Sequence, residues 1–102
     1  MDSCHRTDSD GNPAGGLTTG VGYRIDWQDG PLGRDEERQD PNGAFVEEII
    51  KAAIDRLEFY QRSKFACSAN HQAIEALQTA LTSLQNRTAN REARGVEGTH
   101  TK

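Results

Sequence analysis

Apolar residues recur every third or fourth position along two stretches in the second half of the chain. They are Val46, Ile49, Ile50, Ala53, Ile54 and Leu57 in the first stretch, and Ile74, Leu77, Leu81 and Leu84 in the second. This spacing places the residues of each stretch on one face of an α-helix. The short segment between the two stretches, residues 63–67, predicts that the helices fold back on each other as a hairpin over residues 41–95.

Residues typical of helix ends flank both stretches. Asn42 is suited to cap the N-terminus of the first helix, and Ser68 that of the second. Phe59 and Tyr60 fall in the last turn of the first helix, and Gly95 ends the second.

The residues before the hairpin follow another pattern. Val21, Tyr23, Ile25 and Trp27 alternate with polar or small residues, which predicts a short strand. A lone strand leaves its backbone groups unpaired, so it must pair either with residues 17–20 or with the same strand of a second chain.

The remaining segments are polar. Residues 1–20 carry few apolar side chains, so we expect a disordered or loosely ordered tail there. Residues 21–40 then hold the strand and a charged loop (residues 33–41), which we interpret as a solvated connector. Residues 96–102 form a short C-terminal tail. The expected fold class is α+β, with a short N-terminal β-strand region followed by an antiparallel two-helix hairpin.

Composition and charge narrow the possible partners. The chain has 102 residues, with a formal net charge of −4 and a pI of about 5.3. Because nucleic-acid binding depends on neutralised phosphates, an acidic chain without a basic run is not expected to bind DNA or RNA. No apolar run approaches the ~20 residues of a membrane span, and the N-terminus lacks the apolar segment of a signal peptide. We therefore expect no membrane contact and a cytoplasmic location.

The cysteines and histidines do not form a metal-binding pattern. Cys4 and Cys67 are far apart in sequence and no Cys-x-x-Cys is present, so we interpret them as two free thiols. Cys4 is followed by His5, but no second ligand pair occurs at metal-site spacing. We expect no metal and no cofactor.

The apolar stripe of the second helix turns polar at both ends. The same spacing continues through Asn70 at the front and through Thr88 and Arg91 at the back. Polar groups on a packing face require partners, and a ligand is one candidate. Arg87 and Arg91 are four residues apart, so their guanidinium groups share a helix face and suit one small anionic group.

Geometry excludes a site made of all these residues in one chain. Asn70 and Arg91 are separated by roughly 30 Å along one helix at ~1.5 Å per residue. Tyr60 lies at the hairpin end with Asn70, far from the two arginines. A single hairpin also leaves its apolar stripe uncovered, which favours self-association. A twofold dimer of antiparallel hairpins would bring an aromatic face, an amide and two arginines together twice, a set that suits a nucleotide.

Four segments of the chain form a recognisable combination. They are Gly30–Pro31, Asn42–Ala44, Phe65–Asn70 and Arg87–His100. Together they resemble the phage Thoeris anti-defence sponges of the first type described, which share a helical-hairpin domain with phage anti-CBASS sponges. The resemblance covers residues 21–100.

The resemblance implies a function. Members of this family are phage proteins that act in the cytoplasm of the infected bacterial host. They bind a cyclic ADP-ribose immune signal, glyco-cyclic ADP-ribose, without cleaving it, and so prevent activation of the Thoeris effector. Some form hexamers as trimers of dimers, and these also hold cyclic di- or trinucleotides, the signals of CBASS. The resemblance therefore implies a homodimer or homohexamer that is not an enzyme.

The resemblance also implies the site residues. The ligand pocket, composite across a dimer, would use Tyr60, Asn70, Arg87 and Arg91. The C-terminal residues Arg94, Gly98, Thr99 and His100 would belong to a second, cyclic-oligonucleotide site.

Two other functions are compatible with the residues alone. A nucleotide-degrading enzyme would need metal ligands or an acid–base pair, whereas His71 and His100 are isolated in sequence. A helical-hairpin dimeric adaptor or structural protein without a small-molecule ligand would use the amphipathic hairpin only to pair with protein.

Overall fold

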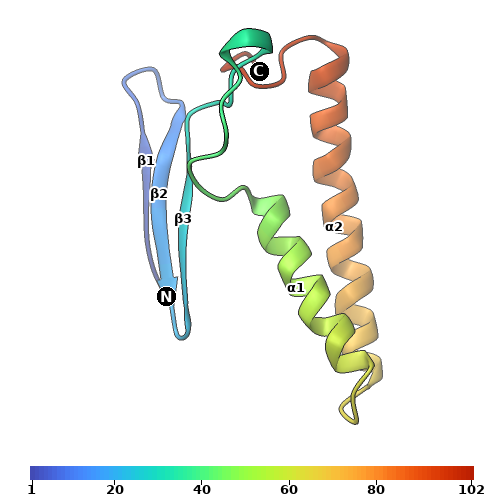
Figure 1. Cartoon of the computed structure of the whole chain (residues 1–102). Helices are drawn as coiled ribbons and strands as arrows, with labels where there is room; N and C mark the ends of the chain where they lie inside the picture. The colour runs from blue at the N-terminus through green and yellow to red at the C-terminus, as the bar shows by residue number, and fades with distance from the viewer. The chain divides into compact units, whose positions relative to one another are not determined.

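The computed structural model describes all 102 residues, and its fold is α+β, as predicted. Three strands precede two helices in the chain (Figure 1). The elements are β1 (Asp2–Thr7), β2 (Pro13–Gly20), β3 (Tyr23–Asp29), the 3-10 helix η1 (Asp35–Glu37), α1 (Val46–Gln61) and α2 (Ser68–Ala93). The chain divides into two compact units, one formed by residues 1–45 with 91–102 and the other by residues 46–90. No helix combines the length and apolar character that a membrane span requires.

The three strands form one antiparallel sheet with β2 in the centre (Figure 1). Thr18 of β2 is buried, and its hydroxyl oxygen lies 3.1 Å from the hydroxyl of Ser3 in β1. The same hydroxyl accepts a hydrogen bond of 2.8 Å from the indole Nε1 of Trp27 in β3. One polar side chain thus connects all three strands, and its burial is matched by hydrogen bonds.

The N-terminal residues differ from the expectation of a loosely ordered tail, because β1 and β2 occupy most of residues 1–20. The Asp8 carboxylate accepts hydrogen bonds of 2.9 Å from the backbone N–H groups of Asp10 and Asn12, which shapes the turn between the strands. At Gly16 a Cβ would collide with the carbonyl oxygen of Cys4, so only glycine permits this close approach. These strands associate through backbone groups and small residues, which apolar patterning does not detect.

The predicted strand is present as β3, and it pairs within the chain. Residues 17–20 of β2 lie opposite residues 23–26 of β3, which confirms the first of the two pairings considered. The two strands are joined by Val21 and Gly22, and Gly22 has a φ of 83°, a value that favours glycine in a tight hairpin turn.

The first helix begins later than predicted. Asn42 does not cap it, because its side-chain amide is engaged by Asp29: Oδ1 accepts from the backbone N–H at 2.8 Å and Nδ2 donates to the carbonyl at 2.9 Å. Ala44 then forms a parallel bridge with Trp27. Residues 42–44 therefore extend the edge of the sheet, and the helix begins at Val46.

The helical hairpin follows the predicted faces. In α2 the half-buried residues are Asn70, Ala73, Ile74, Leu77, Leu81, Leu84, Thr88 and Arg91, and every other residue of the helix is exposed. Apart from Ala73, this set is the predicted stripe with both of its polar extensions. In α1 the buried residue is Ile54, at 9% exposure, on the predicted stripe.

The end of α2 is closed by a glycine motif. Gly95 has a φ of 73°, and its N–H donates to the carbonyl of Glu92. The N–H of Val96 donates to the carbonyl of Arg91. This pair of hydrogen bonds is a Schellman motif, which ends the helix.

Candidate functional site

Tyr60 and Asn70 lie at the end of the hairpin where the two helices are joined. Tyr60, in the last turn of α1, is 36% exposed, and the Arg56 guanidinium lies over its ring at 5.0 Å. Asn70, in the first turn of α2, donates from Nδ2 to Gln61 Oε1 at 3.0 Å and to the carbonyl of Phe65 at 3.2 Å. A partly exposed aromatic ring therefore occurs at the same end of the hairpin as a restrained amide, and both groups suit a nucleobase or sugar.

Arg87 lies near the opposite end of α2. Its Nη2 is 3.5 Å from the Glu47 carboxylate in the first turn of α1, and its side chain is 62% exposed. The Glu47 side chain is 20% exposed, but a 3.5 Å ion pair with a solvent-exposed guanidinium contributes little to stability, so the guanidinium is available to an anion. The pair also connects the start of α1 to the end of α2, while Gln61 and Asn70 connect the other two ends, so the hairpin is antiparallel.

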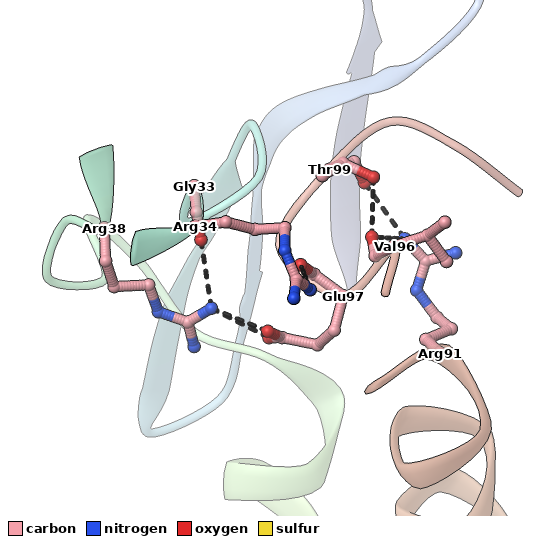
Figure 2. Close-up of polar contacts among 7 residues, drawn as sticks. All are labelled: Gly33, Arg34, Arg38, Arg91, Val96, Glu97 and Thr99. Atoms are coloured by element: carbon pink, nitrogen blue, oxygen red, sulfur yellow. Dashed lines mark hydrogen bonds and ion pairs between the residues drawn. The ribbon is translucent and has the colours of Figure 1, made fainter. Parts of the chain in front are cut away.

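Arg91 has a different environment, because the C-terminal tail folds over its guanidinium (Figure 2). Nη1 donates to the carbonyl of Thr101 at 2.6 Å. Nη2 donates to the carbonyls of Val96 and Thr99, both at 3.0 Å. Arg91 therefore gathers three backbone carbonyl groups of the tail around one charge, and it is half-buried while Arg87 is exposed.

The C-terminal tail also binds the charged loop (residues 33–41). Figure 2 shows Arg38 in contact with both Gly33 and Glu97: its Nη1 donates to the Gly33 carbonyl at 3.1 Å and to the Glu97 carboxylate at 2.8 and 3.0 Å. Arg34 donates to the backbone carbonyl of Glu97 at 2.8 Å. The backbone N–H of Gly33 donates to the carbonyl of Gly98 at 2.9 Å. The loop is therefore not merely a solvated connector, since its arginines and backbone hold the tail.

The four residues of the expected second site all have partners within the chain. Arg94 donates from Nη1 to the carbonyl of Lys102 at 2.7 Å. Gly98 has a φ of 79°, and a Cβ there would collide with the carbonyl oxygen of Gly33. The Thr99 hydroxyl donates to the carbonyl of Val96.

His100, the last of these residues, faces the turn between β1 and β2. Its Nδ1 lies 3.4 Å from the side-chain Nδ2 of Asn12. Hydrogen bonds from the backbone and side chain of Asn12 and from the backbone of Asp10 hold the pKa of the Asp8 carboxyl below its ordinary value, and the charge of His100 adds a smaller attraction. The imidazole is therefore part of the polar surface of this turn.

One chain does not bring the four expected pocket residues together. Asn70 and Arg87 are about 25 Å apart along α2 at ~1.5 Å per residue. Tyr60 lies near Asn70, and Arg91 follows Arg87 by one helical turn. Each end of the hairpin thus carries half of the expected pocket, and the halves could meet only between two chains.

The cysteines and other candidate metal ligands do not cluster. Cys4 and Cys67 are both exposed free thiols. No group of three or more His, Cys, Asp or Glu side chains is close enough together to hold a metal ion.

Several residues of the site were not identified from the sequence. Gln61 contacts Asn70, Glu47 contacts Arg87, and Arg38 contacts Glu97. One signal was present for Gln61: it follows Leu57 by four residues, so it continues the apolar stripe of α1 as a polar residue, as Asn70 does in α2. The pairing of the charged loop with the C-terminal tail has no comparable signal, because the two segments are far apart in sequence.

The chain is similar to known proteins over the hairpin. The family model described as "Acb2/Tad1, hairpin domain" matches residues 21–89. A curated relative, Thoeris anti-defense 1 of Bacillus phage SBSphiJ7, is 51% identical over 61 residues, which make up 60% of this chain and 43% of the relative. The chain therefore spans less than half the length of that relative. The family match includes Tyr60, Asn70 and Arg87, and it ends before Arg91.

Proposed function

The chain belongs to the Acb2/Tad1 hairpin-domain family of Thoeris anti-defence sponges, and we propose that it is a phage protein that counters Thoeris defence by sequestering a cyclic ADP-ribose signal. The ligand we propose is glyco-cyclic ADP-ribose, bound without cleavage in the cytoplasm of the infected host. The family match over residues 21–89 carries this proposal, because it includes three of the four residues expected to form the pocket.

The chemistry of the exposed groups supports such a ligand. The Tyr60 ring offers a surface on which a base can stack, and the Asn70 amide offers a directed hydrogen bond. Arg87 has an exposed guanidinium that suits a phosphate oxygen. This combination binds and orients a nucleotide, and the proposed action is therefore retention of the signal and not its hydrolysis.

The surface of the hairpin supports a site shared between two chains. Only Ile54 of α1 is buried, and no residue of α2 is. Val46 and Phe59 are 49% and 48% exposed, so a large part of the apolar surface of α1 is left uncovered by its own chain. Covering that surface with an antiparallel copy would bring Asn70 of one copy toward Arg87 of the other, giving two identical pockets per dimer.

The proposed second site, for cyclic di- or trinucleotides, lies in the C-terminal tail. Its residues Arg94, Gly98, Thr99 and His100 form a polar cluster in the C-terminal tail, and Thr99 and Gly98 already bind other parts of the chain. A cyclic oligonucleotide would bind there at the cost of some of these contacts.

Native mass spectrometry with and without the cyclic ADP-ribose isomers tests the proposed function. We expect two ligands per dimer, each released unchanged when the protein is denatured by heat. Recovery of a cleaved product would instead indicate an enzyme. An oligomer that binds neither the isomers nor cyclic oligonucleotides would overturn the proposal and favour a dimeric adaptor.

A further inference from the structure

The side-chain amide of Gln61 bridges the end of α1 and the start of α2. Its Oε1 accepts a hydrogen bond from the backbone N–H of Cys67 at 3.0 Å and another from Asn70 Nδ2 at 3.0 Å. Its Nε2 donates to the carbonyl of Cys67 at 3.2 Å. Gln61 is half-buried, and its hydrogen bond with Asn70 is partly shielded from water, whereas its two hydrogen bonds with Cys67 are exposed.

The backbone determines which way this amide points. A backbone N–H can only donate a hydrogen bond and a carbonyl can only accept one. Because Gln61 contacts both groups of Cys67, exchanging its Oε1 and Nε2 would place donor against donor and acceptor against acceptor. The backbone of Cys67 therefore determines that Gln61 Oε1, and not Nε2, faces Asn70.

The same logic fixes the amide of Asn70. Its neighbours Gln61 Oε1 and the Phe65 carbonyl are both acceptors, so the group that faces them must be the donor Nδ2. Both N–H groups of Nδ2 are used in this way. The carbonyl Oδ1 accepts no hydrogen bond within the chain, and it remains as the group that Asn70 offers to a ligand.

We propose that Gln61 is a specificity-determining residue, because it fixes the Asn70 amide so that the site demands a hydrogen-bond donor from the ligand. The donor is an N–H of the base or a hydroxyl of the sugar. A phosphate oxygen or a base carbonyl at this position would face Asn70 Oδ1 as acceptor against acceptor. This inference rests on the proposed function, in which Asn70 contacts the nucleotide.

Two altered ligands test which donor is recognised. The first is a glyco-cyclic ADP-ribose analogue with hypoxanthine in place of adenine, which replaces the exocyclic amine by a carbonyl. The second lacks one free ribose hydroxyl. We expect the parent protein to bind one of these analogues about tenfold more weakly than glyco-cyclic ADP-ribose by calorimetry, because one directed hydrogen bond is lost. Weaker binding of the first analogue identifies the base as the donor, and weaker binding of the second analogue identifies the sugar.

Substitution of Gln61 tests its role as a positioning residue. Gln61→Met keeps the size of the side chain and removes its hydrogen bonds to Asn70 and to Cys67. The Phe65 carbonyl is then the one acceptor left to Asn70 Nδ2, so the amide turns more easily and presents either group. We expect the tenfold preference to fall toward equal binding. Gln61→Glu keeps an acceptor for Asn70 Nδ2 and for the Cys67 N–H but loses the donor to the Cys67 carbonyl, and we expect it to retain the preference. Gln72→Met, at an exposed position of α2, is the matched control and should behave like the parent.

Three results would overturn the proposal. If Gln61→Met has the helical circular dichroism of the parent and still prefers glyco-cyclic ADP-ribose over the analogue tenfold, Gln61 does not set the specificity. Equal binding of all three ligands by the parent shows that Asn70 Oδ1 does not recognise a donor. Failure of the parent to bind glyco-cyclic ADP-ribose at all overturns the proposed function itself, and this inference with it.

Discussion

Arg91 donates a hydrogen bond from Nη2 to the backbone carbonyl of Thr99, 3.0 Å away. The two residues were expected to serve separate ligand sites, yet they bind each other. The second N–H of Nη2 is taken by the carbonyl of Val96. A guanidinium can bind an anion with two hydrogen bonds along either of two edges, Nε with Nη2 or Nη1 with Nη2, and Nη2 belongs to both. A phosphate bound along either edge would therefore have to displace a carbonyl of the tail from Nη2.

Removing the Arg87 side chain should weaken nucleotide binding without lowering the stability of the fold, in contrast to removing the Arg91 side chain. We expect Arg87→Ala to abolish measurable binding of glyco-cyclic ADP-ribose by calorimetry. The free energy of unfolding should change by under about 1 kcal/mol, because the Arg87 guanidinium is exposed and its ion pair with Glu47 is long, at 3.5 Å. Lys51→Ala is the matched control, since it breaks the exposed ion pair of Lys51 with Glu48. Unchanged binding in Arg87→Ala would remove this residue from the pocket.

Arg91→Ala should release the C-terminal tail as well as weaken nucleotide binding. Three hydrogen bonds from its charge to the carbonyls of Val96, Thr99 and Thr101 are lost, which costs on the order of 2 kcal/mol locally. Hydrogen exchange should become faster at the amides of residues 96–102, and it should stay as in the parent in Arg87→Ala. A tail that remains equally protected in Arg91→Ala would show that the loop alone holds it.

Gly98→Ala should separate the C-terminal tail from the charged loop. Gly98 has a φ of 79°, and a Cβ would collide with the carbonyl oxygen of Gly33. Gly22→Ala is the control, because Gly22 has a φ of 83° and open space around it. In both variants the free energy of unfolding, measured by chemical denaturation, should fall by about 1–2 kcal/mol because alanine disfavours a positive φ. Only Gly98→Ala should also speed hydrogen exchange in the tail, and equal exchange in the two variants would argue against the collision.

The turn between β1 and β2 should weaken in acid. Hydrogen bonds from Asn12 and Asp10 stabilise the charged form of Asp8 in the folded protein, so its pKa is lowered on folding. A lowered pKa gives a stabilisation that is complete above the ordinary Asp pKa and is lost as the pH falls through the folded value. Carboxyl NMR titration should show the lowered pKa, and Asp8→Asn should remove this part of the pH dependence of stability. A midpoint at the ordinary Asp value would contradict the hydrogen bonds.

The helices could be predicted because their pattern is local. The spacing of residues such as Ile54 and Leu77 gave the less exposed face of each helix, and it also identified Asn70, Thr88 and Arg91 as polar continuations of one stripe. The start of the first helix could not be predicted in the same way. Asn42 is a good capping residue in isolation, but its hydrogen bonds with Asp29 hold it at the sheet edge.

The pairing of β1 with β2 was not predictable from the alternation of apolar residues. β1 is exposed along its whole length, and the central strand contains three glycines, so neither strand has an apolar face. Backbone hydrogen bonds and the Thr18 hydroxyl hold these strands together. Such contacts become visible only when residues distant in sequence are placed opposite each other.

By itself the sequence determined the helical hairpin, the short strand that precedes it and the residue types that suit a nucleotide, because periodicity and side-chain chemistry are properties of neighbouring residues. Only the tertiary structure decided what each candidate residue contacts. It left Arg87 exposed, enclosed Arg91 in the carbonyls of the C-terminal tail, and fixed the Asn70 amide through Gln61. A hydrogen bond requires two groups within about 3 Å in a set orientation, and that condition depends on the path of the whole chain.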